Sequence, residues 1–171
     1  MELEIKGSSI RSKIRKKKER AKAELKFLDQ VLQLLSEHEV CILGSFWPKT
    51  FGKQVFGAAL HSSAAQGIHS VLQSHLAQIN QFGLVLADSR NDLLNSVVSG
   101  SILSQKLRAS GDRFPNIVEA PGFVNSSHHA MIQMADITAS SIFGRCALSH
   151  SCKKNRVDSF EDRTCSFGRD M

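Results

Sequence analysis

The chain has 171 residues, of which 42% are hydrophobic, and a formal net charge of +6. This length suits one domain with a proper core. No stretch approaches the roughly 18 uncharged apolar residues of a membrane span, and the first residues lack the apolar segment of a signal peptide. The four cysteines show no C-x-x-C spacing. We therefore expect reduced thiols in a cytoplasmic protein without a membrane partner.

The positive charge is concentrated near the N-terminus. Residues 11–26 hold nine basic side chains against Glu19 and Glu24, a net of +7, which leaves the rest of the chain at about −1. Such a strip suits a phosphate backbone, because contact releases bound counterions. The alternative is a solvated helix face. The candidate nucleic-acid-binding residues are Arg11, Lys13, Arg15, Lys16, Lys17, Lys18, Arg20 and Lys22.

Apolar periodicity predicts the elements of the first half of the chain. Alternating three- and four-residue steps predict one long helix from about Ser9 to Glu37. Residues 40–47 are typical of a buried strand ended by Pro48. A second helix is predicted from about residue 54 to residue 80, with two glycines inside it.

In the second half, residues 82–87 give the clearest strand. Because the run is continuously apolar, we expect helices to cover both of its faces. The further predictions are a helix over 93–109, a loop at 111–115, a short strand near 117–124 broken by Pro121-Gly122, and a last helix over 127–146. This order predicts an α/β layered domain with helices packed on a mixed sheet that looks incomplete. Residues 149–171 read as a polar, poorly ordered tail.

Asp136 is the only formally charged residue between Glu119 and Arg145. A carboxylate among apolar neighbours should be partly desolvated, which requires a partner: a metal, a basic side chain or backbone donors. A metal or proton-transfer role predicts an active site, whereas the other partners predict scaffolding. Four polar residues share one face of this helix, and we expect polar partners opposite that face: His129, Gln133, Asp136 and Ser140.

Asp88 follows the best strand, and ligands of open α/β sheets bind beyond the carboxyl ends of the strands. If Asp88 and Asp136 meet, they repel each other unless a cation or a proton lies between them. Such oxygen-rich sites favour Mg²⁺ or Mn²⁺, which support phosphodiester cleavage. The alternatives are a turn or helix-cap role for Asp88, and a buried ion pair with Arg90 or Arg145 for Asp136.

Three short runs in order resemble one family. They are Glu4-Ile5-Lys6-Gly7-Ser8, Val85-Leu86-Ala87-Asp88, and Phe123-Val124-Asn125-Ser126-Ser127 leading into Gln133-Met134-Ala135-Asp136. The combination resembles a bacterial family known as domain of unknown function number thirty-eight hundred, across about residues 2–145. Each run alone is a weak signal.

The resemblance implies a ribonuclease-H-like fold over residues 1–148. It also implies an acidic metal-binding cluster of Glu4, Asp88 and Asp136, with Asp88 and Asp136 catalytic and with Ser127 and Gln133 in supporting roles. Members of the family usually open with a strand bearing an Asp-Glu-Ser-Gly-like motif, which this chain lacks. We therefore expect a truncated or inactive member, or a sheet completed by a dimer mate or another partner chain.

Two functions follow from these observations. The first is a metal-dependent nuclease-like domain that uses Mg²⁺ or Mn²⁺ and holds its substrate on the basic segment. The second is a noncatalytic module on the same scaffold that binds nucleic acid or protein, in which the basic helix matters and the acidic residues do not.

Overall fold

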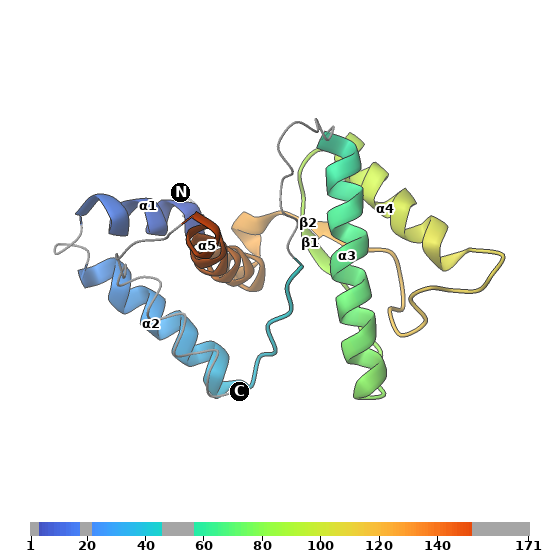
Figure 1. The fold of residues 1–171 in the computed structure, drawn as a ribbon, viewed down its shortest axis with the longest axis horizontal. Helices are drawn as coiled ribbons and strands as arrows, with labels where there is room; N and C mark the ends of the chain where they lie inside the picture. Colours follow the sequence, from blue (N-terminus) through green and yellow to red (C-terminus); the bar gives the residue numbers. More distant parts are fainter. Residues whose placement is uncertain (1–3, 18–21, 46–56, 152–171) are drawn as a thin grey trace. The chain divides into compact units, whose positions relative to one another are not determined.

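The computed structural model describes residues 4–17, 22–45 and 57–151, without the side chains of Arg15, Lys17 and residues 143–151 (Figure 1). The described part is mixed α/β and mostly helical, with a two-stranded parallel sheet. Its elements in chain order are α1 (Gly7–Lys17), α2 (Lys22–Glu37), α3 (Gly57–Gln78), β1 (Leu86–Asp88), α4 (Asp92–Lys106), β2 (Gly122–Val124), the 3-10 helix η2 (Ser126–His128) and α5 (Ala130–Ser151).

These elements form two compact units. Unit 1 contains the chain up to Cys41 together with the chain from Ser126 onward, and unit 2 contains Ile42–Asn125. Helix α5 of unit 1 continues past residue 148 to Ser151. The rest of the predicted polar tail lies outside the described residues. No helix in the described ranges is both long and apolar enough to cross a membrane.

Unit 1 has a core made by three helices. The predicted single helix over residues 9–37 is wrong, because α1 and α2 are separate helices that run in different directions (Figure 1). The residues that join them lie outside the described part. Folding back buries apolar side chains that one straight helix would leave exposed. The buried apolar side chains of unit 1 are Ile10, Ile14, Leu28, Val31, Leu32, Leu35 and Ile137.

Helices α2 and α3 end in the same backbone motif. After α2, the amide of Val40 donates to the carbonyl of Leu35, and Glu39 adopts a φ of 51°. After α3, the amide of Gln81 donates to Leu76 and Asn80 has a φ of 52°. This is the Schellman arrangement, which satisfies the last helical carbonyls.

The strand predicted at residues 40–47 is not found in its described part, since residues 40–45 form no ladder.

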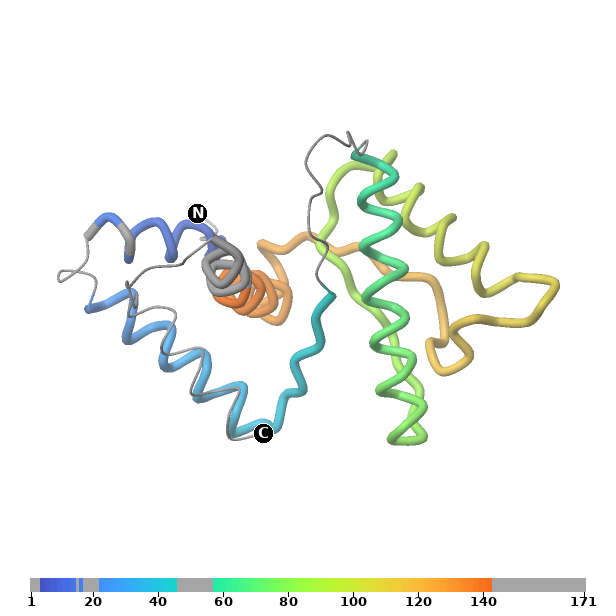
Figure 2. The backbone as a smooth tube through the Cα atoms, viewed as in Figure 1, coloured from blue at the N-terminus to red at the C-terminus, as the bar shows by residue number. Residues whose placement is uncertain are grey.

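Unit 2 is built around a parallel crossover. Strand β1 leads through α4 to β2, with Leu86 opposite Gly122 and Asp88 opposite Val124. A separate parallel bridge joins Gly83 to Ile117. Figure 2 shows the chain leaving α4 and turning back through residues 107–121 to reach β2. The predicted strand near 117–124 is therefore confirmed as these two pieces, separated at Pro121.

Helices α3 and α4 cover one face of this sheet. Leu76 of α3 and Ile102 of α4 are buried together with Ile117, and Val85 packs against the same cluster. A Cβ added at Gly83 would lie 3.0 Å from a methyl carbon of Leu76, so this strand lies directly against α3. The core of unit 2 therefore lies between the helices and the face formed by Gly83, Val85 and Ile117.

Within the described part of unit 2, no helix covers the opposite face of the sheet, which corrects the prediction of helices on both faces. We call this surface the open face and define it by Phe82, Leu84, Leu86 and Val118, all of which are exposed. The strand is shorter than the predicted run 82–87, since β1 begins at Leu86, but exposure alternates from Phe82 through the Gly83 bridge to Leu86 and places these three side chains on one side. Ile117 pairs with Gly83, and both lie on the side that faces the core. Val118, the next residue, therefore lies on the opposite side, with Phe82, Leu84 and Leu86. A continuous apolar run thus occurs here in a strand that is buried on one face only.

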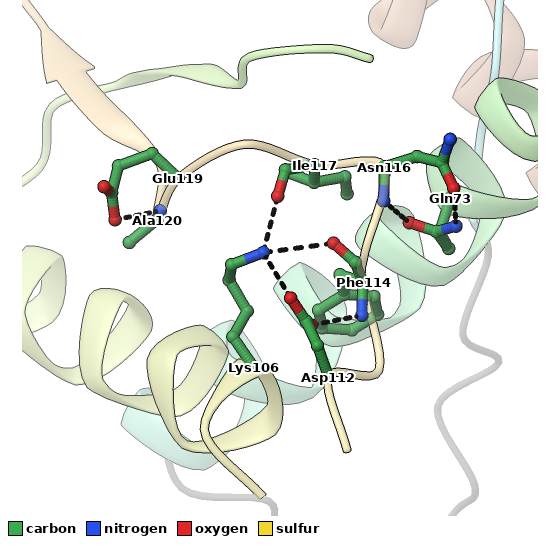
Figure 3. Close-up of polar contacts among 8 residues, drawn as sticks. All are labelled: Gln73, Lys106, Asp112, Phe114, Asn116, Ile117, Glu119 and Ala120. Carbon is green, nitrogen blue, oxygen red and sulfur yellow. Dashed lines mark hydrogen bonds and ion pairs between the residues drawn. The ribbon is translucent and has the colours of Figure 1, made fainter. Parts of the chain in front are cut away.

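The loop before β2 is held by a lysine (Figure 3). Lys106 Nζ donates to Asp112 Oδ2 at 2.9 Å, to the Phe114 carbonyl at 3.1 Å and to the Ile117 carbonyl at 2.5 Å. Its side chain is 11% exposed. All three ammonium protons therefore have acceptors, as a nearly buried charge requires. Gln73 of α3 adds a second tie, through two hydrogen bonds with Asn116.

Candidate functional site

The motif residues of unit 1 meet where the N-terminal segment lies along the start of α5. The Ile5 amide donates to Gln133 Oε1 at 3.2 Å, and the Gly7 amide donates to Asp136 Oδ2 at 2.7 Å. Gln133 Nε2 also donates to the Ser126 carbonyl at 2.8 Å. The prediction of polar partners opposite this helix face is confirmed for Gln133 and Asp136, whose partners are the backbone amides of Ile5 and Gly7.

Glu4 belongs to the same cluster. Its Oε1 accepts a hydrogen bond from the Ser126 hydroxyl at 2.7 Å, and its other oxygen lies 3.3 Å from Lys6 Nζ. These two partners, the serine first, hold the pKa of Glu4 below its usual value. The serine in contact with Glu4 is therefore Ser126, next to the predicted supporting residue Ser127.

Gly7 allows α1 and α5 to approach closely. A Cβ at this position would lie 2.7 Å from the Asp136 carbonyl oxygen, 2.7 Å from Ile137 Cα and 2.8 Å from Ser140 Oγ. Real contacts of this kind are essentially never so short. The glycine of the Glu-x-Lys-Gly run is therefore explained by helix packing.

Asp136 is exposed, so the predicted desolvation is wrong. Among the partners considered from the sequence, the structure provides a backbone donor, the amide of Gly7 at the first residue of α1. A carboxylate at this position satisfies a free helical amide and interacts favourably with the positive end of the helix dipole. This contact is of the scaffolding kind.

Asp88 lies in unit 2 at the end of β1 and pairs with Arg90, with 3.7 Å between Oδ2 and Nη2. The cap of α4 is a different residue, Asn91, whose side chain accepts from the Leu94 amide. Glu4 and Asp136 thus share unit 1, whereas Asp88 belongs to the other unit. Within each unit, the described residues contain no group of three or more His, Cys, Asp or Glu side chains placed to hold a metal ion.

The basic segment is only partly described. Lys13, Lys16 and Lys22 are exposed. Arg11 differs from them, since it is half-buried and its Nη1 donates to the Ser140 carbonyl of α5 at 3.4 Å. Arg11 therefore helps to hold α1 on α5. The backbone of Arg15 and Lys17 lies in α1, while Lys18 and Arg20 lie outside the described residues.

Sequence reasoning missed a buried histidine, His69 of α3. It is 2% exposed, its Nδ1 lies 2.7 Å from the Ala65 carbonyl, and its ring packs on Phe114 with 5.7 Å between centroids. Its Nε2 has no hydrogen-bond partner among the described atoms. Burial, together with the charge of Lys106, lowers the pKa of His69. Its neighbours in sequence are ordinary helix residues, so no local signal could have identified it.

No protein-family model, no curated protein and no solved structure matches this chain.

Proposed function

We propose that this chain is a noncatalytic nucleic-acid-binding module whose contact surface is the basic segment of α1 and the start of α2. The observation that carries the proposal is a set of exposed lysines on α1, which is anchored to α5, and on the start of α2. Lys13 and Lys16 are exposed on α1, and Lys22 and Lys26 are exposed on α2. Residues 11–26 carry a net charge of +7, whereas the whole chain carries +6. Exposed lysines attract phosphates, and phosphate binding releases the counterions of the nucleic acid.

The contacts of α1 support this assignment. The apolar side chains Ile10 and Ile14 are buried and Arg11 bonds to α5, so this part of the helix is fixed to the scaffold. The free amide at the start of the helix is already occupied by Asp136. Phosphate binding by a bare helix N-terminus is therefore not available at Gly7, and the lysine side chains remain as the phosphate ligands.

Fluorescence anisotropy with labelled RNA and DNA of mixed sequence tests the proposal. We expect affinity to fall steeply between about 50 mM and about 200 mM KCl, because each neutralised phosphate contributes roughly −0.9 to the slope of log K against log salt. The double variant Lys13→Gln, Lys16→Gln should weaken binding to all sequences alike and reduce the slope by about 2.

The matched control is Arg90→Gln with Arg108→Gln, which removes two exposed positive charges from unit 2. Net charge then changes equally in both variants. Equal losses would mean that only total charge matters, and binding that does not respond to salt would overturn the proposal.

A second candidate is the metal-dependent nuclease, which one observation favours. Gln133 and Asp136 accept hydrogen bonds from the backbone of residues 5–7, and Glu4 and Gln133 both bond to Ser126, so three residues implied by the family resemblance bond to the same two segments of unit 1. This reading predicts Mg²⁺ or Mn²⁺ binding by calorimetry, lost in Asp136→Asn and in Asp88→Asn. If the wild-type chain binds neither ion and leaves nucleic acid intact at millimolar metal, this candidate is excluded.

The ribonuclease-H-like fold and the family resemblance belong with that second candidate. Such a fold needs at least one strand beside β1 and β2. The Val85 carbonyl and the Ser89 amide form hydrogen bonds with β2. Backbone groups alternate in direction along a strand, so those of Leu84 and Leu86 point to the other, outer edge of β1. A strand from a partner chain could pair there.

A further inference from the structure

The open face is larger than the scattered apolar exposure of an ordinary surface. Phe82, Leu84, Leu86 and Val118 are 72%, 70%, 57% and 58% exposed and lie next to one another on the two paired segments. Four such side chains expose on the order of 400 Å² of apolar surface, a size that often marks an interaction site. A two-stranded sheet with one bare apolar face is also marginal by itself.

The charges around the open face do not suit a polyanion or a membrane surface. Asp88 follows Leu86 on the same strand and pairs with Arg90, and Glu119 follows Val118. The two segments that carry the open face, residues 82–90 and 117–119, thus hold two acidic residues and one basic residue. Nucleic acid and anionic lipid both require a basic rim, so an apolar protein surface is the occupant that fits.

Within the described residues, unit 1 offers no matching surface. Its only strongly exposed large apolar side chains are Leu34 and Met131, on two different helices. The other large apolar side chains described in unit 1 are buried or half-buried. The remaining exposed large apolar side chains described in unit 2 lie on or directly after its helices: Ile79, Leu93, Leu103 and Leu107. Among the described residues, the sheet surface that matches the open face in chemistry is therefore the same face on a second copy of the chain.

We propose that two copies pack open face to open face and form a homodimer with the helices of unit 2 on the outside. Two sheets packed in this way lie roughly 10 Å apart, with the side chains of Phe82, Leu84, Leu86 and Val118 from both copies between them. The buried area is on the order of 1,000 Å², near the lower limit of a specific interface. The dimer is therefore weak, with a Kd of about 10–100 µM.

Sedimentation velocity and light scattering on the full chain test this, from about 1 µM to about 500 µM so that the range spans the expected Kd. The wild type should pass from monomer to dimer. Leu84→Lys places a charge at the centre of the face and should raise the Kd at least tenfold. The matched control is Leu107→Lys: Leu107 is 75% exposed, but it follows α4, which covers the other side of the sheet.

Circular dichroism at low concentration checks that both variants fold, which is expected because both leucines are exposed. A wild type that stays monomeric at every concentration would overturn the proposal, as would an equal effect of the two variants. If the wild type is monomeric and Leu84→Lys lowers its melting temperature, the face is covered within one chain and the dimer is excluded. The result does not depend on nucleic-acid binding.

Discussion

The backbone amide of Gly7 donates a 2.7 Å hydrogen bond to the carboxylate of Asp136, which lies 129 residues later in the chain. The bond fixes the start of α1 on α5, and the two residues also lie in direct contact, since a side chain at position 7 would strike the Asp136 carbonyl. The most conspicuous acidic residue of the sequence thus serves as the cap of a helix that is distant in the chain.

Removing the Asp136 carboxylate should destabilise unit 1. Asp136→Ala deletes the acceptor for the Gly7 amide and should lower the free energy of unfolding by about 1 kcal/mol. Asp136→Asn keeps an oxygen acceptor but loses the charge near the helix end, so its cost should be smaller, about 0.5 kcal/mol. Chemical denaturation followed by circular dichroism measures both. A structural role is contradicted if both variants unfold like the wild type.

Gly7→Ala should be clearly destabilising although alanine favours helices. The added Cβ would require α1 and α5 to separate, at a cost of about 1–3 kcal/mol. The matched control is Gly100→Ala in α4, where the added Cβ has no neighbour within 4 Å. There the same substitution should stabilise by about 0.5–1 kcal/mol. Opposite signs in thermal unfolding are expected; the same sign at both positions would refute the packing interpretation.

Lys106→Met should loosen the loop before β2. The substitution keeps most of the apolar stem but leaves Asp112 and the carbonyls of Phe114 and Ile117 without their donor. Losing charged hydrogen bonds in a nearly buried position should cost about 2–4 kcal/mol. Hydrogen exchange should show faster exchange at residues 112–118. Lys26→Met, an exposed lysine of α2, should leave these amides unchanged.

Mild acid should destabilise unit 2 through His69. Burial, together with Lys106, lowers the folded-state pKa of His69 below 6.5, so the unfolded chain takes up its proton first. The contribution to stability is intact above about pH 6.5 and is lost as the pH falls toward the folded pKa. His69→Leu keeps the side chain apolar and should flatten the dependence between about pH 7.5 and about pH 5.5.

Titration of the carboxylates of Asp112 and Glu4 does not interfere with this test. Asp112 is subject to burial, which raises its pKa, but the bonds from Lys106 and the Phe114 amide outweigh it and the net shift is downward. The pKa of Glu4 is also lowered. Their contributions are present above the ordinary carboxyl range and are lost only at more acid pH. An unchanged pH dependence in His69→Leu would exclude His69 as the source.

The sequence by itself determined most helices and the first strand. Helices α3, α4 and α5 follow apolar patterns that are local, and β1 overlaps the end of the apolar run at residues 82–87, because side-chain periodicity depends only on neighbouring residues. Charge concentration in residues 11–26 is likewise visible without any fold.

Only the tertiary structure decided which partners these residues meet. The division of the first helix into α1 and α2, the uncovered face at Leu84 and Leu86, and the contact of Asp136 with Gly7 all depend on residues far apart in the chain. The sequence of a continuous apolar strand is the same whether one face or both faces are buried. Likewise, the sequence around a carboxylate does not show whether its partner is a metal ion or a backbone amide. Such choices are made by long-range packing, which local patterns do not encode.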